Sequence, residues 1–374
     1  MSWSPQQTQA MRAVASWITD KKGPQVFRLF GYAGSGKTTL AKHMADGVDG
    51  DVLFGAFTGK ASLVLRKKGC VGASTIHSMI YKPVEDPISG ITEFVLNPDS
   101  EVDRASLVII DEVSMVGEDL ARDLLSFGTK VLVLGDPAQL QPVKGDGYFI
   151  NAKPDVMLTE VHRQAAENPI IRMSMDVREG RGLKLGAYGE SRVIARRDVS
   201  KESLREMVMQ ADQLLCGTNK TRQAFNTRVR ELKGISGVGA NWHPVKGDRL
   251  VCLKNNRSKG LLNGGLWEVQ SATLRQYGKK FEMRLKSLDD DDAAHVDVEV
   301  PPQFFLGTEK EMDWRELKRV DHLTFGQALT VHKSQGSQWD NVMLFDEGAV
   351  FGEHAAKHLY TGLTRAAERV TVIV

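Results

Sequence analysis

The sequence has few cysteines, no long apolar run and almost no net charge. Cysteine occurs 3 times in 374 residues, at positions without the spacing of metal ligands, so neither a disulfide framework nor a zinc site is indicated. We interpret Cys70, Cys216 and Cys252 as reduced thiols. No apolar run approaches the ~20 residues of a membrane span, and the segment MSWSPQQTQA at 1–10 lacks the basic and apolar regions of a secretion signal. We therefore expect a cytoplasmic protein with no membrane partner.

The charge balance says little about partners. The 49 Lys and Arg residues against 47 Asp and Glu residues give a net charge of +2, so no global field attracts polyanions. Binding to nucleic acid would therefore depend on a local basic track. The length of 374 residues exceeds the size at which single cores stop growing, about 250–300 residues, so we expect two or more domains.

The segment GYAGSGKTT at 31–39 is typical of a phosphate-binding loop (P-loop). It follows an apolar run, Val26–Phe30, that reads as a buried strand. The glycines allow backbone N–H groups to surround phosphate oxygens, and the helix that follows offers its positive end. Lys37 is expected to reach the β- and γ-phosphates, and the hydroxyl of Thr38 to hold Mg²⁺. The residues assigned to this loop's phosphate contacts are Gly34, Ser35, Gly36, Lys37, Thr38 and Thr39.

The segment VIIDEVSM at 108–115 places two carboxylates at the end of a second apolar strand. Ligand chemistry gathers at the carboxyl ends of strands in doubly wound sheets. We expect Asp111 to hold Mg²⁺ together with Thr38, and Glu112 to polarise water. The alternative, a surface loop and an ordinary strand end, is weak for these motifs in this order.

The first 165 residues alternate between strand and helix patterns, which predicts a parallel sheet with helices on both faces. The predicted helices are Thr8–Trp17, 36–46, 59–68 and 116–127, and the predicted strands are 26–30, 51–57, 106–111 and 130–135. The pattern breaks between Tyr81 and Asp103, where prolines surround the alternating run Ile91–Leu96. This predicts a small inserted hairpin.

A second α/β region is expected from near Met157. It includes a strand at Gln213–Cys216 and a helix at Lys220–Leu232. From about Gly239 to Leu323, strands at Val245–Leu253, Gly265–Leu274 and Lys280–Leu288 suggest a small β-barrel insert. The α/β pattern then resumes with His322–Val331, Val342–Phe345, the helix Glu353–Arg365 and the strand Val370–Val374.

Two arginines and a glutamine follow predicted strands or lie on a terminal helix. Gln139, beside Asp136 in LVLGDPAQLQPV, has an amide that can sense a γ-phosphate. Arg163 in LTEVHRQ and Arg365 in YTGLTRAAERV are candidates for arginine fingers, because a planar guanidinium spreads charge over several phosphoryl oxygens. An arginine is usually only surface charge, but the motif context favours the finger.

Hydroxyl, lysine and histidine side chains cluster in loops after strands in both halves of the chain. The segments FTGKAS at 57–62, ASTIHSM at 73–79 and ALTVHKSQG at 328–336 carry groups that suit phosphates and unstacked bases. A lone histidine is more often a satisfied buried residue, so the nucleic-acid interpretation rests on two of them in similar loops. The residues assigned to single-stranded DNA are Thr58, Lys60, Thr75, His77, Asn219, Thr330, His332 and Lys333.

The order of these motifs resembles the order found in superfamily 1 helicases. The residues within the motifs resemble those of the RecD/Dda branch, superfamily 1B. The motifs are the P-loop, TGKAS, STIH, DEVSM, GDPAQLQPV, VHRQ, TVHKSQGSQWDNV and YTGLTRA. In length and layout the chain is most similar to phage helicases of the Dda type. SWSPQQ at 2–7 looks like the adenine-contacting Q motif, with Gln7 as the reader. His162 stands where relatives often have an aromatic residue, and with Gly336 it completes the implied ATP contacts.

The resemblance implies an α/β protein with two RecA-like domains, ATP in the cleft between them and single-stranded DNA across their top. It implies domain 1A at 1–81 and 103–156, a hairpin insert 1B (the pin) at 82–102, domain 2A at 157–238 and 324–374, and an SH3-like insert 2B at 239–323. Phe94 is the candidate wedge that parts a duplex, although packing on its own hairpin is nearly as good an interpretation.

The implied function is an ATP-dependent DNA helicase that uses Mg²⁺ and moves 5′ to 3′ on single-stranded DNA. The implied location is the cytoplasm of a bacterium or of a phage-infected host. The protein is expected to act there as a monomer at a duplex fork, with replication or recombination proteins as possible partners. A P-loop kinase or small-molecule ATPase is the first alternative, a non-enzymatic loading factor the second. RNA unwinding stays open, because readers of the 2′-hydroxyl carry no short signature.

Overall fold

The computed structural model describes residues 3–85, 92–142, 147–160, 167–235, 242–275, 279–290 and 293–374. The chain forms two compact units, Met1–Leu183 with Phe351–Thr364, and Lys184–Val350 with Arg365–Val374. Across the described ranges, no helix is both long and apolar enough to span a membrane. Short 3₁₀ segments occur at Glu101–Arg104, Val113–Met115, Arg196–Asp198, Arg257–Lys259, Glu309–Glu311, His332–Ser334 and Gly348–His354.

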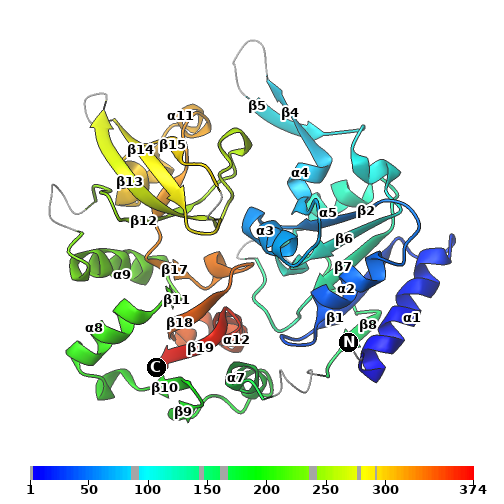
Figure 1. Cartoon of the computed structure of the whole chain (residues 1–374), viewed down its shortest axis with the longest axis horizontal. Coiled ribbons are helices and arrows are strands. Elements are labelled where there is room, and N and C mark those ends of the chain that lie inside the picture. Colours follow the sequence, from blue (N-terminus) through cyan, green and yellow to red (C-terminus); the bar gives the residue numbers. More distant parts are fainter. Residues whose placement is uncertain are drawn as a thin grey trace. The chain divides into compact units, whose positions relative to one another are not determined.

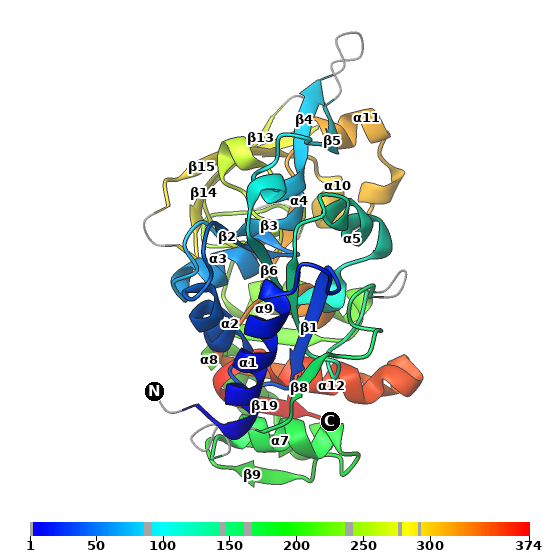
Figure 2. The same ribbon diagram turned by 90° about the vertical axis from the view of Figure 1, so that its right-hand side faces the viewer.

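The first unit is built on a 6-stranded parallel sheet with the order β3-β2-β6-β7-β1-β8. Alternate residues of its strands face opposite cores, as the pleat of a sheet requires. Thus Leu107 and Ile109 pack with α1 and α2, whereas Val108 and Ile110 pack with α4 and α5 (Figures 1 and 2). The expected parallel sheet with helices on both faces is confirmed. The strands are β1 Val26–Gly31, β2 Val52–Ala56, β3 Ser74–Thr75, β6 Leu107–Asp111, β7 Val131–Gly135 and β8 Val156–Leu158.

The helices of the first unit come from both ends of the chain. In sequence order they are α1 Pro5–Thr19, α2 Lys37–Ala45, α3 Gly59–Lys67, α4 Ile76–Ile80, α5 Glu118–Leu125, α7 Pro169–Arg178 and α12 Ala355–Leu363. Residues 157–182 and the C-terminal helix were expected to belong to the later α/β region. Instead β8 pairs in parallel with β1, with Met157 opposite Phe30, and α7 and α12 belong to the first unit. Such pairing is invisible in sequence, because it joins segments far apart along the chain.

The second unit contains another 6-stranded sheet, with the order β17-β11-β18-β19-β10-β9. Its strands are parallel apart from β9, which pairs antiparallel with β10. The strands are β9 Gly186–Tyr188, β10 Ser191–Ile194, β11 Gln213–Cys216, β17 Ala328–Thr330, β18 Trp339–Phe345 and β19 Ala366–Ile373. The helices α8 Lys201–Gln210 and α9 Asn219–Leu232 pack against it, in the green segment of Figure 1.

An antiparallel 5-stranded sheet with the order β15-β14-β13-β12-β16 is inserted in the second unit. Its elements are β12 Arg249–Cys252, β13 Leu266–Arg275, β14 Lys280–Ser287, β15 Val296–Val300, β16 Leu323–Phe325, and the short helices α10 Gln303–Leu306 and α11 Trp314–Lys318. The β-rich insert is therefore present, while its assignment as an SH3-like barrel stays a prediction.

The segment His322–Val331, with which the α/β pattern was expected to resume, contains two strands in different sheets: β16 in the insert and β17 in the parallel sheet. Gly326 lies between them, and a Cβ built on it would stand 3.0 Å from the backbone N of Val251. The absence of a side chain thus lets the chain pass close to β12 as it changes sheets. The Gly-Gln pair between two apolar runs is a local sign in the sequence that the chain changes sheets here.

The predicted hairpin forms an antiparallel pair, β4 Tyr81–Glu85 with β5 Thr92–Leu96, drawn in cyan at the top of Figure 1. At its base the hydroxyl of Tyr81 donates to Asp123 of α5. Burial, and after it the contact with Asp123, raises the pKa of Tyr81. The hairpin is thus anchored to the first unit by a polar contact as well as by chain connectivity.

Candidate nucleotide and nucleic-acid sites

The loop after β1 has the backbone of a phosphate cradle. Gly34 and Gly36 have φ values of 80° and 76°, a left-handed conformation that side chains disfavour. Gly31 is required for another reason: a Cβ there would stand 2.6 Å from Ser35 Oγ and 2.9 Å from Leu158 Cβ. Gly36 is also the N-cap of α2, so the loop leads directly to the positive end of a helix.

Polar side chains hold this loop in place. Lys37 Nζ donates to the carbonyl oxygens of Gly31 at 2.6 Å and Tyr32 at 3.1 Å. Gln7 Nε2 donates to the carbonyl oxygen of Ser35 at 3.1 Å, while its Oε1 accepts from Ser4 N in the capping box of α1. Gln7 therefore ties α1 to the loop, and its reading of adenine stays a prediction.

The two motifs found first in the sequence meet at the carboxyl end of the first sheet. Thr38 Oγ1 donates to Asp111 Oδ2 at 2.7 Å, and the backbone N of Glu112 donates to Asp111 Oδ1 at 2.8 Å. Hydroxyl and carboxylate oxygens side by side are ligands that suit Mg²⁺. In the described part of the chain, no group of three or more His, Cys, Asp or Glu residues could hold a metal ion. A metal here would therefore rely on substrate phosphates and water for its other ligands.

Glu112 has a strained backbone. Among the described residues other than glycine, it is the one with positive φ, 54° with ψ 47°. Such conformations cost about 1–3 kcal/mol and cluster at functional sites. This left-handed conformation of Glu112 turns the chain sharply after β6, and the 3₁₀ segment Val113–Met115 follows.

Asp136, at the end of β7, connects the loop to the C-terminal helix α12. Tyr360 of α12 donates its hydroxyl to Asp136 Oδ2 at 2.7 Å, and the same hydroxyl accepts from the backbone N of Ala33 at 2.9 Å. Thr361 Oγ1 accepts from Leu140 N at 2.8 Å. These contacts explain why α12 groups with the first unit.

Gln139 follows Asp136 and is buried, and its backbone N donates to Asp136 O at 3.1 Å. The carboxyl ends of β1, β6 and β7 therefore bring together most of the nucleotide residues predicted from the sequence. Sequence reasoning missed Tyr360, the first residue of the YTGLTRA motif, because its contact with Asp136 joins segments far apart along the chain.

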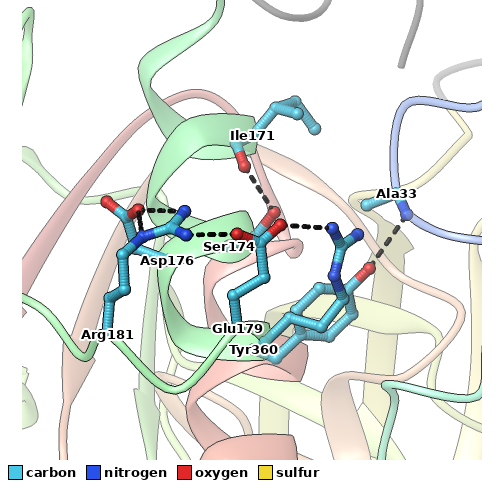
Figure 3. A network of polar contacts seen from close by, with 8 residues as sticks. Ala33, Ile171, Ser174, Asp176, Glu179, Arg181 and Tyr360 are labelled. Atoms are coloured by element: carbon cyan, nitrogen blue, oxygen red, sulfur yellow. Dashed lines mark hydrogen bonds and ion pairs between the residues drawn. The ribbon is translucent and has the colours of Figure 1, made fainter. Parts of the chain in front are cut away.

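Helix α7 contributes a second support for the loop. The guanidinium carbon of Arg178 lies 3.7 Å from the ring centroid of Tyr32, a cation–π contact. Figure 3 shows the surrounding network, in which Arg181 links Asp176 and Glu179 while Tyr360 reaches Ala33. Hydrogen bonds from Arg181 and then Arg178 lower the pKa of Glu179. Neither Tyr32 nor Arg178 was expected from the sequence.

Of the other predicted nucleotide residues, two lie outside the described residues and two belong to the second unit. Arg163 and His162 lie outside the described residues. Arg365 belongs to the second unit, is 5% exposed, and donates through Nη1 to Ser337 O at 3.3 Å. Gly336, which precedes Ser337 in the sequence, has a φ of 73°. Thr39 follows Thr38 in the first turn of α2 and is exposed.

The predicted DNA residues of the first unit follow β2 and β3. Thr58 caps α3 by accepting from Ala61 N, and Thr75 caps α4 by accepting from Ser78 N. Lys60 is buried. His77 is exposed, and its ring lies 5.6 Å from that of Tyr81 at the base of the hairpin.

In the second unit, the predicted DNA residues follow β17. Thr330 Oγ1 accepts from Lys333 N, and Lys333 Nζ donates to Asn263 Oδ1 of the insert at 3.4 Å. Burial lowers the pKa of His332 and that of Lys333, and the charge of Arg222 adds to the effect on Lys333. Sequence reasoning missed Arg222 and Asn263, which extend this cluster onto α9 and onto the insert.

The N-terminus of α9 is already engaged by a carboxylate. Glu347 accepts from Gly217 N at 2.6 Å, Thr218 N at 3.0 Å and Thr221 Oγ1 at 2.5 Å. The predicted residue Asn219 accepts from Arg222 Nε at 3.3 Å. Asn219 is exposed.

Comparison with known proteins gives two family matches. A family described as an AAA domain matches residues 2–198, and one described as a UvrD-like helicase C-terminal domain matches residues 325–373. An ATP-dependent RecD2 DNA helicase of Deinococcus radiodurans is 29% identical, over 95% of this chain and 48% of its own. The conjugal transfer protein TraA of Agrobacterium fabrum is 25% identical, over 92% of this chain and 31% of its own. The chain thus spans half or less of the length of these relatives.

Solved structures share the fold. A Bacteroides Pif1 bound to single-stranded DNA has a TM-score of 0.57 at 18% identity, covering 99% of this chain and 92% of its own. The Pif1 helicase from Candida albicans has a TM-score of 0.52 at 18% identity, covering 100% and 95%. The predicted fold class, α/β with two RecA-like domains, is confirmed. The family match over residues 2–198 covers more than half of the chain, so the chain belongs to the AAA domain family, and its similarities to a UvrD-like helicase C-terminal domain and to a RecD2 helicase agree with the predicted resemblance to RecD-type helicases.

Proposed function

We propose that the chain is an ATP-dependent DNA helicase that moves 5′ to 3′ on single-stranded DNA and opens duplex DNA ahead of it. The observation that carries the proposal is the 2.7 Å hydrogen bond between Thr38 and Asp111, with the strained Glu112 beside it. This is the oxygen pair and neighbouring carboxylate that a nucleoside triphosphatase needs. A binding module would have no use for the strain.

The nucleotide is held by the cradle of Gly34 and Gly36, with Lys37 turning from its carbonyl partners to the phosphates. Thr38 and Asp111 would hold Mg²⁺, which when bound neutralises phosphate charge. Glu112 orients and activates the attacking water, and Gln139 reports the γ-phosphate. The adenine is contacted by Gln7, with Ser35 and Thr39 completing the loop side, and His162 and Gly336 as further contacts.

Coupling to movement rests on the division into domains 1A, 1B, 2A and 2B. Arg163 and Arg365 act as fingers on the γ-phosphate, so that binding draws the RecA-like domains together and hydrolysis releases them. Thr58, Lys60, Thr75 and His77 grip DNA on 1A. Asn219, Thr330, His332 and Lys333 grip it on 2A. Alternating grip converts closure into steps.

Strand separation is assigned to the hairpin β4–β5. Phe94 is 61% exposed, and Val84, Val95 and Leu96 on the same hairpin are also exposed. An exposed apolar hairpin suits unpaired bases. The name of one relative, a DNA helicase, supports DNA as the substrate. Replication or recombination proteins are the partners that we propose.

The test is strand displacement with 5′-tailed and 3′-tailed duplexes of equal length. We expect ATP-dependent opening of the 5′-tailed duplex, an ATPase rate that rises strongly with single-stranded DNA, and loss of both in Glu112→Gln with nucleotide binding retained. Glu118→Gln, an exposed glutamate on α5, is the matched control and should behave as the parent.

The rivals give different outcomes. An ATPase indifferent to DNA would favour a small-molecule kinase or ATPase, and DNA binding without turnover would favour a loading factor. Opening of RNA duplexes at a similar rate would widen the substrate class, and preference for the 3′-tailed duplex would overturn the direction.

A further inference from the structure

The short helix α11 of the insert carries a tryptophan that is half exposed. Trp314 is 50% exposed. The guanidinium carbon of Arg315 and Nζ of Lys318 each lie 5.1 Å from its ring centroid, so cations flank the indole. Large aromatic rings are costly to leave in water and are enriched at binding surfaces. An exposed ring framed by cations is the arrangement found on platforms for unstacked bases.

This helix is connected by hydrogen bonds to the predicted DNA residues of the second unit. Lys333 Nζ donates to Asn263 Oδ1 at 3.4 Å, and Asn263 N donates to Asn255 Oδ1 at 2.6 Å. Asn255 belongs to the loop after β12. In that loop Leu253 N donates to His322 O at 2.8 Å, and the ring of His322 bonds Leu317 O of α11 through Nε2 at 2.7 Å. Hydrogen bonds and a short stretch of loop backbone therefore form a path that connects Lys333 to α11 within the second unit.

Positive charge gathers along the path. Lys254, in the loop after β12, is exposed on the whole, but partial burial, followed by the charge of Lys318, lowers its pKa. Lys254 and Lys318 are thus neighbours of like sign. Such a pair stores repulsion that a polyanion relieves.

The acidic residues of α11 do not offset this charge at the ring. Asp313 is the N-cap of the helix and accepts from Arg315 N at 2.8 Å. Glu316 lies two positions from Trp314, on the opposite side of a helical turn, whereas Lys318 shares the side of Trp314. Glu309, in the 3₁₀ segment that precedes α11, is close enough to His322 for its charge to raise the pKa of that histidine, an effect smaller than that of burial, which lowers it. Glu309 is thus an acidic residue near His322 and outside α11.

We propose that Trp314 is a stacking platform for a base of single-stranded DNA, with Lys318, Arg315 and Lys254 contacting the flanking phosphates. The platform extends the track that begins at Lys333. It rests on the proposed function, since it presumes that DNA follows β17. Single-stranded rather than duplex DNA is the occupant, because only an unstacked base presents its face to an indole.

The test measures affinity of the full chain for fluorescent oligothymidylates of about 4 to about 16 nucleotides, the range of single-strand site sizes, by anisotropy without ATP. Trp314→Ala should weaken the longer oligonucleotides about 5-fold to about 100-fold and leave the shortest unchanged. Trp314→Phe should keep most of the affinity but lose part of the tryptophan quenching that DNA causes. Lys318→Ala should reduce the slope of log K against log salt by about 0.7.

Controls come from α8, which carries Met209, 44% exposed, and the exposed Lys201. Met209→Ala removes exposed apolar surface, as Trp314→Ala does, and Lys201→Ala removes one positive charge, as Lys318→Ala does. Neither control should alter the affinity for DNA or the ATPase rate without DNA. Equal binding by parent and Trp314→Ala at every length would overturn the platform alone, as would a loss that is the same at all lengths or confined to duplex DNA. A parent chain that does not bind DNA would overturn the platform together with the proposed function.

Discussion

The hydroxyl of Tyr360 lies 2.7 Å from Asp136 Oδ2 and also accepts the backbone N–H of Ala33. One phenol thereby joins the phosphate-binding loop to the end of β7. Burial, followed by the charge of Asp136, raises the pKa of Tyr360, so the group stays a donor. The loop's conformation thus depends on a residue from the far end of the sequence.

Replacing Tyr360 by Phe should lower the free energy of unfolding by about 1–3 kcal/mol, because a buried carboxylate and a backbone N–H lose their partner. The KM for ATP should rise as the loop loosens. Urea unfolding and steady-state kinetics measure both effects. Tyr188→Phe, which removes an exposed hydroxyl bonded to Lys184 N, should change unfolding by less than about 0.5 kcal/mol. A Tyr360→Phe protein as stable as the parent would contradict the contact.

Position 112 should prefer glycine to alanine. Because φ is 54° there, Glu112→Gly should be more stable than Glu112→Ala by about 1 kcal/mol, although neither hydrolyses ATP. At the exposed interior position 122 of α5 the order should reverse, with Arg122→Gly less stable than Arg122→Ala by about 0.5–1 kcal/mol. Chemical denaturation of the four variants measures the differences. The same order at both positions would show that residue 112 is not strained.

The buried ion pair between α9 and the residue that precedes β12 should be sensitive to loss of one partner. Arg230 and Asp248 are 2% and 0% exposed, and Arg230 Nε donates to Asp248 Oδ1 at 2.6 Å. Asp248→Ala should cost about 3–5 kcal/mol, since it strands a buried guanidinium. The exposed pair Arg228–Glu231 on the same helix is the control. Glu231→Gln should cost less than about 1 kcal/mol in urea denaturation.

DNA affinity should fall with rising pH through the titration of Lys333. Burial lowers the pKa of this ammonium, so its charge is lost at a lower pH than usual, and a phosphate contact favours the charged form. Affinity should therefore be full below that pKa and decline above it, by up to about tenfold per pH unit for one coupled proton. Anisotropy titrations measure this. Lys333→Arg should flatten the profile, whereas Lys201→Arg should leave the decline as in the parent.

Phe94→Ala should separate strand opening from stepping. The side chain is 61% exposed on β5, so its loss should barely alter stability, DNA-stimulated ATPase or translocation on single strands. Duplex unwinding should fall, because a stacking partner worth about 1–3 kcal/mol per base is gone. Equal loss of unwinding and translocation would assign Phe94 to packing, and unchanged unwinding would move the wedge to another residue of the hairpin.

The nucleotide cluster was predictable because its parts are local. A phosphate cradle is built from consecutive backbone groups, so GYAGSGKTT carries its own geometry, and Asp111 follows an apolar strand whose end is readable. The strands and helices that were predicted within residues 26–135, apart from the inserted hairpin, were also correct to within a few residues, although β3 and α4 were not predicted. These features need no knowledge of distant partners.

The contacts that support the cluster could not be predicted in the same way. Tyr360 meets Asp136 across a separation of 224 residues, and the stacking of Arg178 on Tyr32 depends on where α7 packs. β8 and the split of His322–Val331 between sheets are likewise set by tertiary pairing rather than by local pattern. Of these features, the change of sheet at Gly326 is the one with a sign in the local sequence.

The return of α12 to the first unit bears on how the chain can be divided for study. The matched AAA domain ends at residue 198, and a fragment cut there would contain the whole cradle. It would still lack the phenol that Ala33 and Asp136 share. The phosphate-binding loop of this fragment would therefore lack one of its supporting hydrogen-bond partners. A loss of ATPase activity on truncation would not by itself show that the missing residues take part in ATP hydrolysis.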